Sequence, residues 1–283
     1  MKITFWGVRG SIPAPGPETA RYGGNTMCLE VRTAKGDLVI IDAGTGLAQL
    51  GNTLLPSGFG KGQGEAAIML SHAHMDHIQG FPFFAPIYIP GNRFTIYGLE
   101  KAPGRLEAIF EGQMNPHFSP VHSLKNLGAD FEFESLQQQA SSEAYGLTVR
   151  CFTVPHGSTT ALAFRFEEAG RTLCVATDAG YPESGVGDDV IDFFRGADVL
   201  VHDCTYTPED QAERRNRGFS SIAEAAHLAA RAGVGRLVMI HYDQDYTDDE
   251  VDVLRDRCRG FLDDEGGQDI ALTAAAEGMT LDI

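Results

Sequence analysis

The segment His72-Ala73-His74-Met75-Asp76-His77 constrains the fold of this chain more than any other stretch. It places four side chains of metal-binding type within six residues, directly after the apolar run from Ala66 to Leu70. That run predicts a buried strand, so the turn after it would hold its ligands on rigid backbone. Imidazole and carboxylate together suit borderline divalent metals, zinc first. The alternative is a solvated polar turn, which would have no reason to keep this spacing.

Three later polar residues follow apolar strands in the same way. His156 follows the strand-like run that ends near Val154, Asp178 follows Ala176-Thr177, and His241 follows Met239-Ile240. A single histidine at a strand end is more often a hydrogen-bonded structural residue than a ligand. Taken together, and in the order His, Asp, His, the three predict the ligands that a two-metal site needs beyond the HxHxDH turn.

Strand-like and helix-like segments mix in both halves of the chain. Strands are expected at 2–8, 27–32, 38–41, 67–70, 147–154, 160–166, 172–176, 199–202 and 237–240, with two short strands at the end; helices are expected at 46–54, 188–194, 221–232 and 248–262. Ser221 and Glu224 form a capping-box pattern, and Gly233 should end that helix. This mixture favours an α/β (α+β) four-layer αββα sandwich, with two mixed β-sheets and helices on the outer faces.

The length of 283 residues accommodates one large domain over residues 1–283. A region at about 81–127 is rich in Pro, Gly and aromatic residues and has little clean periodicity, so we expect an arm or flap insertion there. The aromatic residues of this region include Phe81, Phe83, Phe84, Tyr88 and Phe94. They could line a pocket, but we favour a place in the hydrophobic core.

The net charge and the cysteines limit which binding partners and which cellular location this chain is expected to have. The net charge of −17 argues against broad binding to nucleic acid or to an anionic membrane. A small anionic substrate stays compatible, because bound cations reverse the field locally. Five widely spaced cysteines without a CxxC pair indicate reduced thiols and a cytoplasmic protein. No apolar run is as long as a membrane span, and apolar residues of the arm could form a homodimer interface.

The ligand pattern resembles that of the metallo-β-lactamase superfamily of metal-dependent hydrolases. Within it, the chain looks like the branch that holds tRNase Z and the phosphoribosyl cyclic phosphodiesterase. The specific likeness lies in the motifs Gly7-Val8-Arg9-Gly10-Ser11, Arg21-Tyr22-Gly23-Gly24-Asn25-Thr26, Leu200-Val201-His202-Asp203 and Gly233-Val234-Gly235-Arg236-Leu237. It covers essentially the whole chain.

The resemblance implies a role for each candidate ligand. One metal would be held by His72, His74 and His156, the other by Asp76, His77 and His241, with Asp178 bridging the two. A hydroxide between the two divalent ions would be the nucleophile. Zinc is the expected metal, and manganese or iron are alternatives. Asp42 matches an early aspartate of the superfamily and is expected to orient ligands or loop backbone.

One position departs from the branch. Where the branch has a histidine that assists protonation of the leaving oxygen, this chain has Phe219, and Asp203 stands where the acidic partner would be. Such a donor typically contributes about 10²–10⁴-fold in rate. Either the substrate needs no acid, or His202 or His117 replaces it, or catalysis has decayed. Beside Asp76 and Asp178, we therefore take His202 and Asp203 as catalytic candidates.

The glycine-rich loop from Gly7 to Thr26 has two readings of equal weight. Its backbone amides and the guanidinium groups of Arg9 and Arg21 could face a substrate phosphate. Alternatively, its glycines could serve only tight turns between the first two strands.

The leading functional hypothesis is a dinuclear phosphodiesterase that acts on a small cyclic phosphate or cyclic nucleotide. The alternatives are a hydrolase of the same fold that acts on a lactone, thioester or β-lactam, and a metal-binding sensor with decayed catalysis. A nuclease for tRNA 3′ ends is the least favoured hypothesis, because the chain is acidic and no basic arm is evident.

Overall fold

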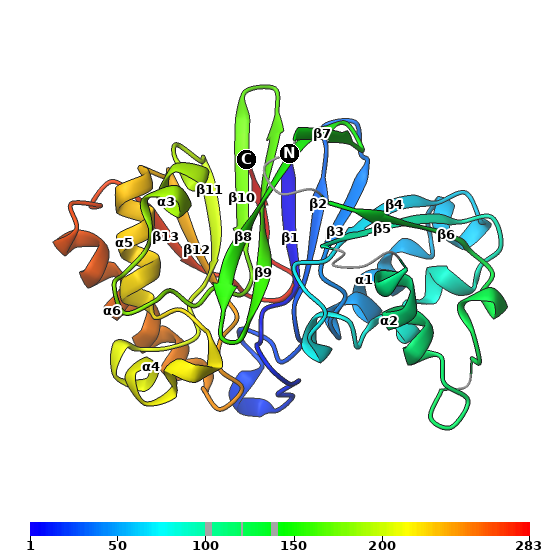
Figure 1. Ribbon diagram of the computed structural model, residues 1–283, viewed down its shortest axis with the longest axis horizontal. Helices are drawn as coiled ribbons and strands as arrows, with labels where there is room; N and C mark the ends of the chain where they lie inside the picture. Colours follow the sequence, from blue (N-terminus) through cyan, green and yellow to red (C-terminus); the bar gives the residue numbers. More distant parts are fainter. Residues whose placement is uncertain (100–103, 120, 137–140) are drawn as a thin grey trace.

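Two seven-stranded mixed sheets form the centre of the molecule (Figure 1). The computed structural model describes residues 1–99, 104–119, 121–136 and 141–283. The first sheet has the order β14 (Thr280–Asp282), β1 (Lys2–Gly7), β2 (Cys28–Arg32), β3 (Leu38–Ile41), β4 (Glu65–Met69), β5 (Arg93–Gly98) and β6 (Asp130–Ser135). The second has the order β13 (Ala271–Ala274), β12 (Arg236–Ile240), β11 (Val199–Asp203), β10 (Arg171–Ala176), β9 (Thr159–Glu168), β8 (Leu147–His156) and β7 (Ser141–Ala144).

Helices cover the outer face of each sheet (Figure 1). The first sheet is covered by α1 (Gly46–Leu54) and α2 (Arg105–Gln113); the second by α3 (Asp188–Phe194), α5 (Ile222–Ala232) and α6 (Asp248–Asp264), with α4 (Pro208–Arg214) beside them. This arrangement confirms the αββα sandwich expected from the sequence.

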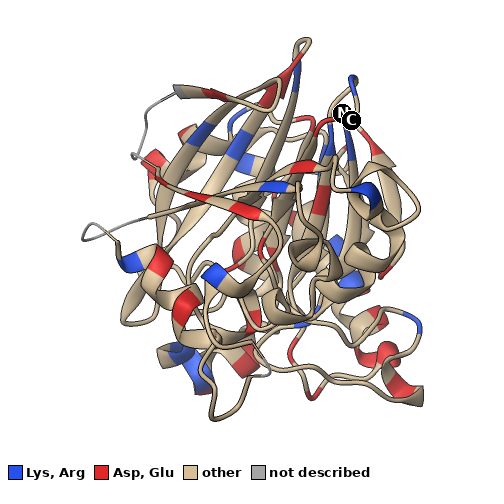
Figure 2. Cartoon of the chain, turned by 90° about the vertical axis from the view of Figure 1, so that its right-hand side faces the viewer, with Lys and Arg blue, Asp and Glu red and all other residues tan. Residues whose placement is uncertain are grey.

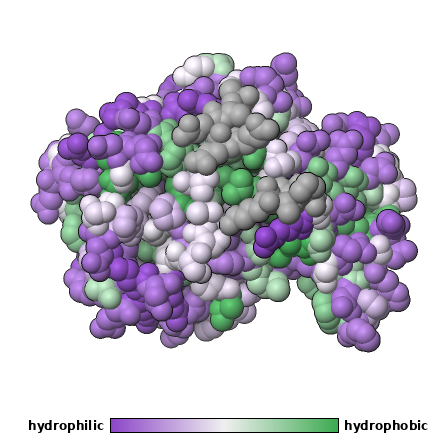
Figure 3. Space-filling view, viewed as in Figure 1, coloured by the Kyte–Doolittle hydropathy of each residue, from purple (hydrophilic) through white to green (hydrophobic). Residues whose placement is uncertain are grey.

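Strand alternation explains why the layers stack. In β3, Val39 and Ile41 belong to the core shared by the two sheets, whereas Leu38 and Ile40 belong to a second core under α1 and α2. A strand that is apolar on both faces must be covered on both faces, because its side chains alternate. The surface in Figure 3 is correspondingly mostly hydrophilic, with smaller hydrophobic areas between.

Several element boundaries agree with the sequence analysis. Helices α1 and α3 begin and end at the expected residues. The capping box of Ser221 and Glu224 opens α5, and Gly233 ends it with a left-handed φ of 64°.

The range 81–127 contributes regular elements to the sandwich. Strand β5 lies between β4 and β6 in the first sheet, and α2 lies on its outer face. Phe81, Phe84 and Phe94 are buried in the core under α1 and α2, as favoured for the aromatic residues, whereas Phe83 is 70% exposed. None of the helices in the described part of the chain has the length and apolar character needed to cross a membrane.

Candidate metal centre

Strand ends of the two sheets meet at one cluster of histidines and aspartates. The turn after β4 supplies His72, and the ends of β8, β10 and β12 lead to His156, Asp178 and His241. The structure brings together all seven predicted ligands. It groups their ligand atoms in three overlapping sets whose members lie within 4.8 Å of one another: His72/His74/His156, His72/His77/Asp178 and Asp76/His77/His241.

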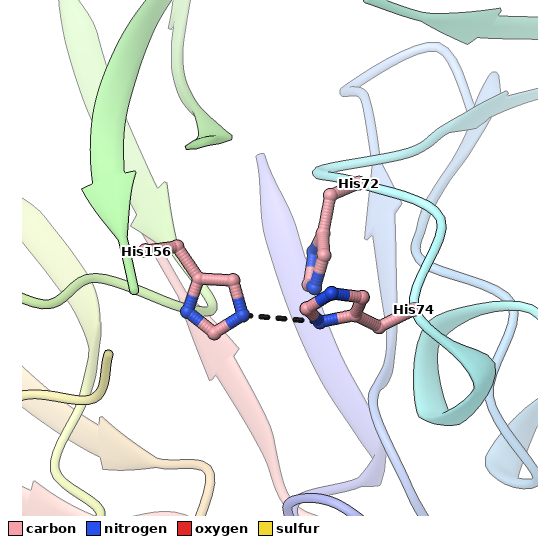
Figure 4. Close-up of side chains that lie close together, drawn as sticks. All are labelled: His72, His74 and His156. Carbon is pink, nitrogen blue, oxygen red and sulfur yellow. Dashed lines mark hydrogen bonds between the residues drawn. The ribbon is translucent and has the colours of Figure 1, made fainter. Parts of the chain in front are cut away.

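The first set spans the two sheets. Figure 4 shows His72 and His74 on the loop after β4 and His156 at the end of β8, with their rings converging. Nε2 of His156 lies 3.1 Å from Nδ1 of His74. Two imidazole nitrogens on one tetrahedral zinc ion are about 3.3 Å apart, given Zn–N bonds of about 2.0–2.1 Å. The nitrogens of His74 and His156 therefore have the spacing of two ligands on one metal ion, and the ligand atom of His72 lies within 4.8 Å of both.

The group Asp76/His77/His241 forms the second candidate ligand set and is almost fully buried, and the group His72/His77/Asp178 joins it to the first set. Nε2 of His77 lies 3.3 Å, and Nε2 of His241 3.5 Å, from Oδ2 of Asp76. The backbone N–H of Ser11 donates to the same Asp76 oxygen at 2.8 Å and fixes its position.

Asp178 lies between the two sets and faces each with a different oxygen. Its Oδ2 is 3.8 Å from Nε2 of His72 and 3.5 Å from Nε2 of His156. Its Oδ1 is 3.0 Å from Nε2 of His77 and 3.3 Å from Nε2 of His241. This carboxylate is therefore positioned to bridge two cations.

The charges of the cluster favour a bound cation. Burial would raise the pKa of Asp178, but the facing imidazoles of His241 and His77 hold it well below its ordinary value. Burial would lower the pKa of His241, but Asp178 and Asp76 raise it to about 9. Burial and the neighbouring His77 lower the pKa of His72. The carboxylates of the cluster therefore stay ionised. Their negative charge favours positive charge beside them, either as protons on the imidazoles or as bound metal ions.

The residues present fit divalent metal ions. Among the described residues, Nε2 of His72, His77 and His241 and Oδ1 of Asp178 are buried without a hydrogen-bond partner. Leaving such atoms unsatisfied costs about 1–3 kcal/mol each. A cation held by these lone pairs would remove that cost, and mixed nitrogen and oxygen ligands are those of zinc and related metals.

Contacts behind the ligands orient the rings. Nδ1–H of His156 donates to the carbonyl of Gly218 at 2.8 Å, and Nδ1 of His241 lies 2.9 Å from the hydroxyl of Thr205. That hydroxyl donates onward to Asp203 at 2.6 Å. With Nδ1 engaged behind each ring, the Nε2 lone pair points into the cluster.

Asp42 orients the turn after β4, as expected. It accepts hydrogen bonds from the backbone N–H and hydroxyl of Ser71 at 2.8 and 2.9 Å, and lies 2.8 Å from Nδ1 of His77. The Ser71 hydroxyl in turn lies 3.0 Å from Nδ1 of His72. One carboxylate thus positions a ring in each of the two sets.

We expect Asp42→Asn to weaken metal binding by about 10–100-fold while the fold is retained. Asparagine tolerates the left-handed φ of 61° at this position, but its amide N–H would face Nδ1–H of His77. Competition with a chromogenic chelator measures the loss. Asp37→Asn, which alters a turn carboxylate bonded to Thr33, is the matched control. Equal metal affinity in both variants would contradict the role of Asp42.

The stability of the metal-free protein should fall as pH rises. His241 has a pKa of about 9 in the folded protein and 6.5 ordinarily, so the folded state holds this proton more tightly. The stabilisation is complete below pH 6.5 and is lost towards pH 9, by about 3 kcal/mol. Chemical denaturation of chelator-treated protein at the two pH values measures it. His241→Gln should flatten the dependence, and an equally steep dependence in that variant would rule out His241 as its source.

The structure places His202 and Asp203 outside the cluster. Nδ1 of His202 lies 2.7 Å from the carbonyl of Asp203, and its Nε2 lies 2.8 Å from the hydroxyl of Tyr181, so both ring nitrogens are engaged. The Asp203 carboxylate ties three loops together, and burial raises its pKa to about 7. His117 is exposed beyond α2.

The N-terminal loop contacts the cluster through its backbone. Ser11, with a left-handed φ of 66°, donates its N–H to Asp76, and Gly10 packs against the ring of His241. Arg9 is fully buried and donates to the carbonyls of Gly23, Asp243 and Tyr246. Its guanidinium group is therefore structural.

Arg21 points away to α6. It pairs with Asp249 and Asp252 at 2.7 and 2.6 Å. The contribution of Gly10 and Ser11 was not recognised from the sequence; the motif Gly7–Ser11 was its only signal.

Comparison with known proteins identifies the family. Residues 38–242 match the family model described as a Beta-lactamase superfamily domain. Ribonuclease Z of Bradyrhizobium diazoefficiens is 26% identical over 299 residues, which cover 88% of this chain and 92% of the relative.

Two solved structures share the fold over the full length of the chain. A diphosphatase of the PhnP family has a TM-score of 0.67 at 20% identity, covering 100% of this chain and 97% of its own. Zn(2+)-bound PqqB from Methylobacterium extorquens has a TM-score of 0.70 at 17% identity, covering 100% of both chains. These findings and the histidine–aspartate cluster confirm the resemblance derived from the sequence: the chain belongs to the β-lactamase superfamily, and it is a metal-dependent hydrolase with the metallo-β-lactamase fold.

Proposed function

We propose that this chain is a dinuclear phosphodiesterase that acts on a small phosphodiester, with cyclic phosphates and cyclic nucleotides as the first substrates to test. The observation that carries the proposal is the position of Asp178, whose two oxygens face two separate sets of histidines. Two cations bridged in this way are suited to phosphoryl transfer.

Each residue of the cluster has a role in this proposal. His72, His74 and His156 would hold one ion, and Asp76, His77 and His241 the other, with Asp178 shared. Zinc is the proposed metal, supported by the histidine-rich ligands and by zinc in PqqB, with manganese or iron as alternatives. When bound, the cations would supply an activated water and neutralise charge on the phosphate.

A cavity beside the cluster supports a small substrate. It has a volume of about 270 Å³ and extends from His72 and His74 to Arg105 and Ile109 of α2 and Thr160 of β9. This volume is near the lower end of ligand pockets, about 300–1,000 Å³. Arg105 supplies a cation for an anionic substrate, and Thr160 a hydroxyl.

Surface charge favours a small molecule over RNA. Figure 2 shows acidic and basic residues interspersed on the face that carries β6. The net charge of −17 further opposes broad phosphate-backbone contacts. RNA is nevertheless the second candidate substrate, because a relative that covers 88% of this chain is named ribonuclease Z. The five cysteines are all buried, and the thiols of Cys28, Cys174, Cys204 and Cys258 are free, which supports the proposed cytoplasmic location.

A substrate panel with metal analysis tests the proposal. The panel contains bis(p-nitrophenyl) phosphate, cyclic nucleotides, a lactone, a thioester, a β-lactam and precursor tRNA. We expect two metal ions per chain and turnover of the phosphodiesters. Turnover of only the carbonyl substrates would overturn the phosphodiesterase assignment, and salt-sensitive cleavage of precursor tRNA would favour the nuclease. A fully metal-loaded protein that hydrolyses none of these substrates would support the alternative of a metal-binding sensor with decayed catalysis.

A further inference from the structure

The ring of Phe219 lies across the two sets of the metal centre. Its centroid is 5.3 Å from that of His156 and 4.9 Å from that of His241, so it contacts one ring from each set. The side chain is partly exposed, so an apolar surface borders the cluster on the side open to solvent.

The turn that carries Phe219 is firmly held. The carbonyl of Gly218 accepts from His156, and the backbone N–H of Ser220 donates to Asp203 at 3.1 Å. The Ser220 hydroxyl donates to the carbonyl of Ala179 at 2.6 Å. Both neighbours of Phe219 are therefore fixed to loops of the site, which holds the backbone of Phe219 in place.

Asp203 cannot give a proton to a substrate from this position. It is fully buried, and its Oδ2 accepts from the backbone N–H groups of Ala179 and Ser220. Its Oδ1 accepts from the N–H and the hydroxyl of Thr205. Both oxygens of this buried carboxylate are therefore engaged as acceptors.

The other acids of the described chain near this turn are buried, bonded or distant. The ring of Tyr206 packs against that of Phe219, and its hydroxyl is buried without a hydrogen-bond partner among the described residues. Both nitrogens of His202 are bonded, and its ring packs against Phe194 and Tyr181. The Tyr181 hydroxyl is the partner of His202 and is buried. His117 and His122 are exposed beyond α2, and no described contact joins them to the cluster. Among the residues that the structure describes, none is therefore assigned as the acid for the leaving group.

We propose that this active site is selective for phosphodiesters whose leaving group departs as a stable anion, such as a phenolate or an enolate. The inference rests on the proposed phosphodiesterase function and narrows its substrates: a cyclic nucleotide, whose leaving oxygen is a sugar alkoxide, should be hydrolysed more slowly than an ester with an acidic leaving group. In the reaction, the oxygen of water bonds to phosphorus and the ester P–O bond breaks. The electron pair stays on the leaving oxygen, and the proton lost by water is released to solvent. Because no side chain protonates the leaving oxygen, its own acidity sets the rate.

A series of aryl methyl phosphates tests the proposal with the metal-loaded protein. The leaving phenols range from p-nitrophenol to unsubstituted phenol, whose pKa is about 10. We expect kcat/KM to fall by about 10²-fold or more across the series, since a donor would otherwise contribute about 10²–10⁴-fold. In Phe219→His, the ratio between the p-nitrophenyl and phenyl esters should shrink by at least about 10-fold. Phe219→Leu, which stays apolar, should keep the steep ratio.

A second readout does not depend on turnover. The absorption spectrum of p-nitrophenol added to the loaded protein reports whether bound nitrophenol is an anion. We expect the phenolate band with the natural chain and a shift towards the neutral phenol in Phe219→His. Metal content and thermal unfolding of each variant check that the histidine has not become a ligand.

The outcomes separate the two proposals. A shallow dependence on the leaving group in the natural chain would show that another acid acts, and would overturn the inference while the phosphodiesterase function stands. An unchanged ratio and an unchanged spectrum in a metal-loaded, folded Phe219→His variant would overturn it as well. Failure of every phosphodiester, the p-nitrophenyl ester included, would instead remove the proposed function.

Discussion

The Asp178→Asn variant should lose at least about 10³-fold in kcat/KM and bind fewer metal ions per chain. Asp178 faces His72 and His156 with one oxygen and His77 and His241 with the other, at 3.0–3.8 Å. Asparagine has the same shape but replaces one charged oxygen by an N–H donor that cannot bind a cation. Losing charge stabilisation of several kcal/mol in the transition state corresponds to a rate loss of this size. Steady-state kinetics and metal analysis by mass spectrometry measure the two effects.

The matched control is Asp198→Asn, directly before β11. Asp198 accepts from the backbone N–H of Thr172 and pairs with Arg171 at 2.7 Å, away from the cluster. This variant should keep its metals and its activity. If Asp178→Asn also keeps both, the carboxylate does not bridge the two sets. If it melts far below the control, the loss of activity reports unfolding and Asp178→Glu becomes the informative change.

The ligand set was predictable because its residues follow apolar strands. Asp178, His241 and the turn at His72 come after β10, β12 and β4, whose residues are nearly all buried. Strands β10, β11 and β12 are parallel neighbours, so their carboxyl ends lie together at one edge of the sheet. The local pattern therefore specified which residues meet, although it could not specify their distances.

The elements within and after 81–127 were harder to predict for physical reasons. Strand β6 alternates Phe131 and Phe133 with acidic residues at the edge of a sheet, and no residue of β6 is fully buried. Helix α2 buries only Leu106 and Phe110 and contains Gly112, so its helical period is weak. Strand β5, by contrast, has clean alternation, with Phe94 and Ile96 buried, and the glycines and prolines around it obscured that signal.

The roles of Phe219, Asp203 and Gly10 depend on contacts between distant parts of the chain. The Asp203 carboxylate accepts hydrogen bonds from the backbone N–H groups of Ala179 and Ser220. Gly10 packs against the ring of His241, which lies 231 residues later in the chain. Neither contact leaves a periodic signal in the sequence. The resemblance to a family drew attention to Phe219, but only the structure shows that its ring touches both His156 and His241.

We expect Gly10→Ala to lower kcat/KM by at least about 100-fold and to weaken binding of the metal for which we propose His241 as a ligand. A Cβ at Gly10 would lie 2.3 Å from Cε1 and 2.5 Å from Nδ1 of the His241 ring. The Gly10 backbone cannot easily retreat, because its N–H donates to the carbonyl of Tyr242. His241 is also constrained, by Thr205 and by its left-handed φ of 60°. A displacement of about 1 Å at a reacting centre costs about 10²-fold.

Gly112→Ala provides the matched control for this prediction. A Cβ at Gly112 would meet no atom of the described chain within 4 Å, and alanine favours the helical backbone of α2. This variant should keep full activity and unfold at the same or a slightly higher temperature. Gly10→Ala should remain folded but lose part of its metal, which circular dichroism and metal analysis separate. Full activity and metal content in Gly10→Ala would mean that the loop from Gly10 to Ser11 yields without disturbing His241, and that its close packing is dispensable for the site.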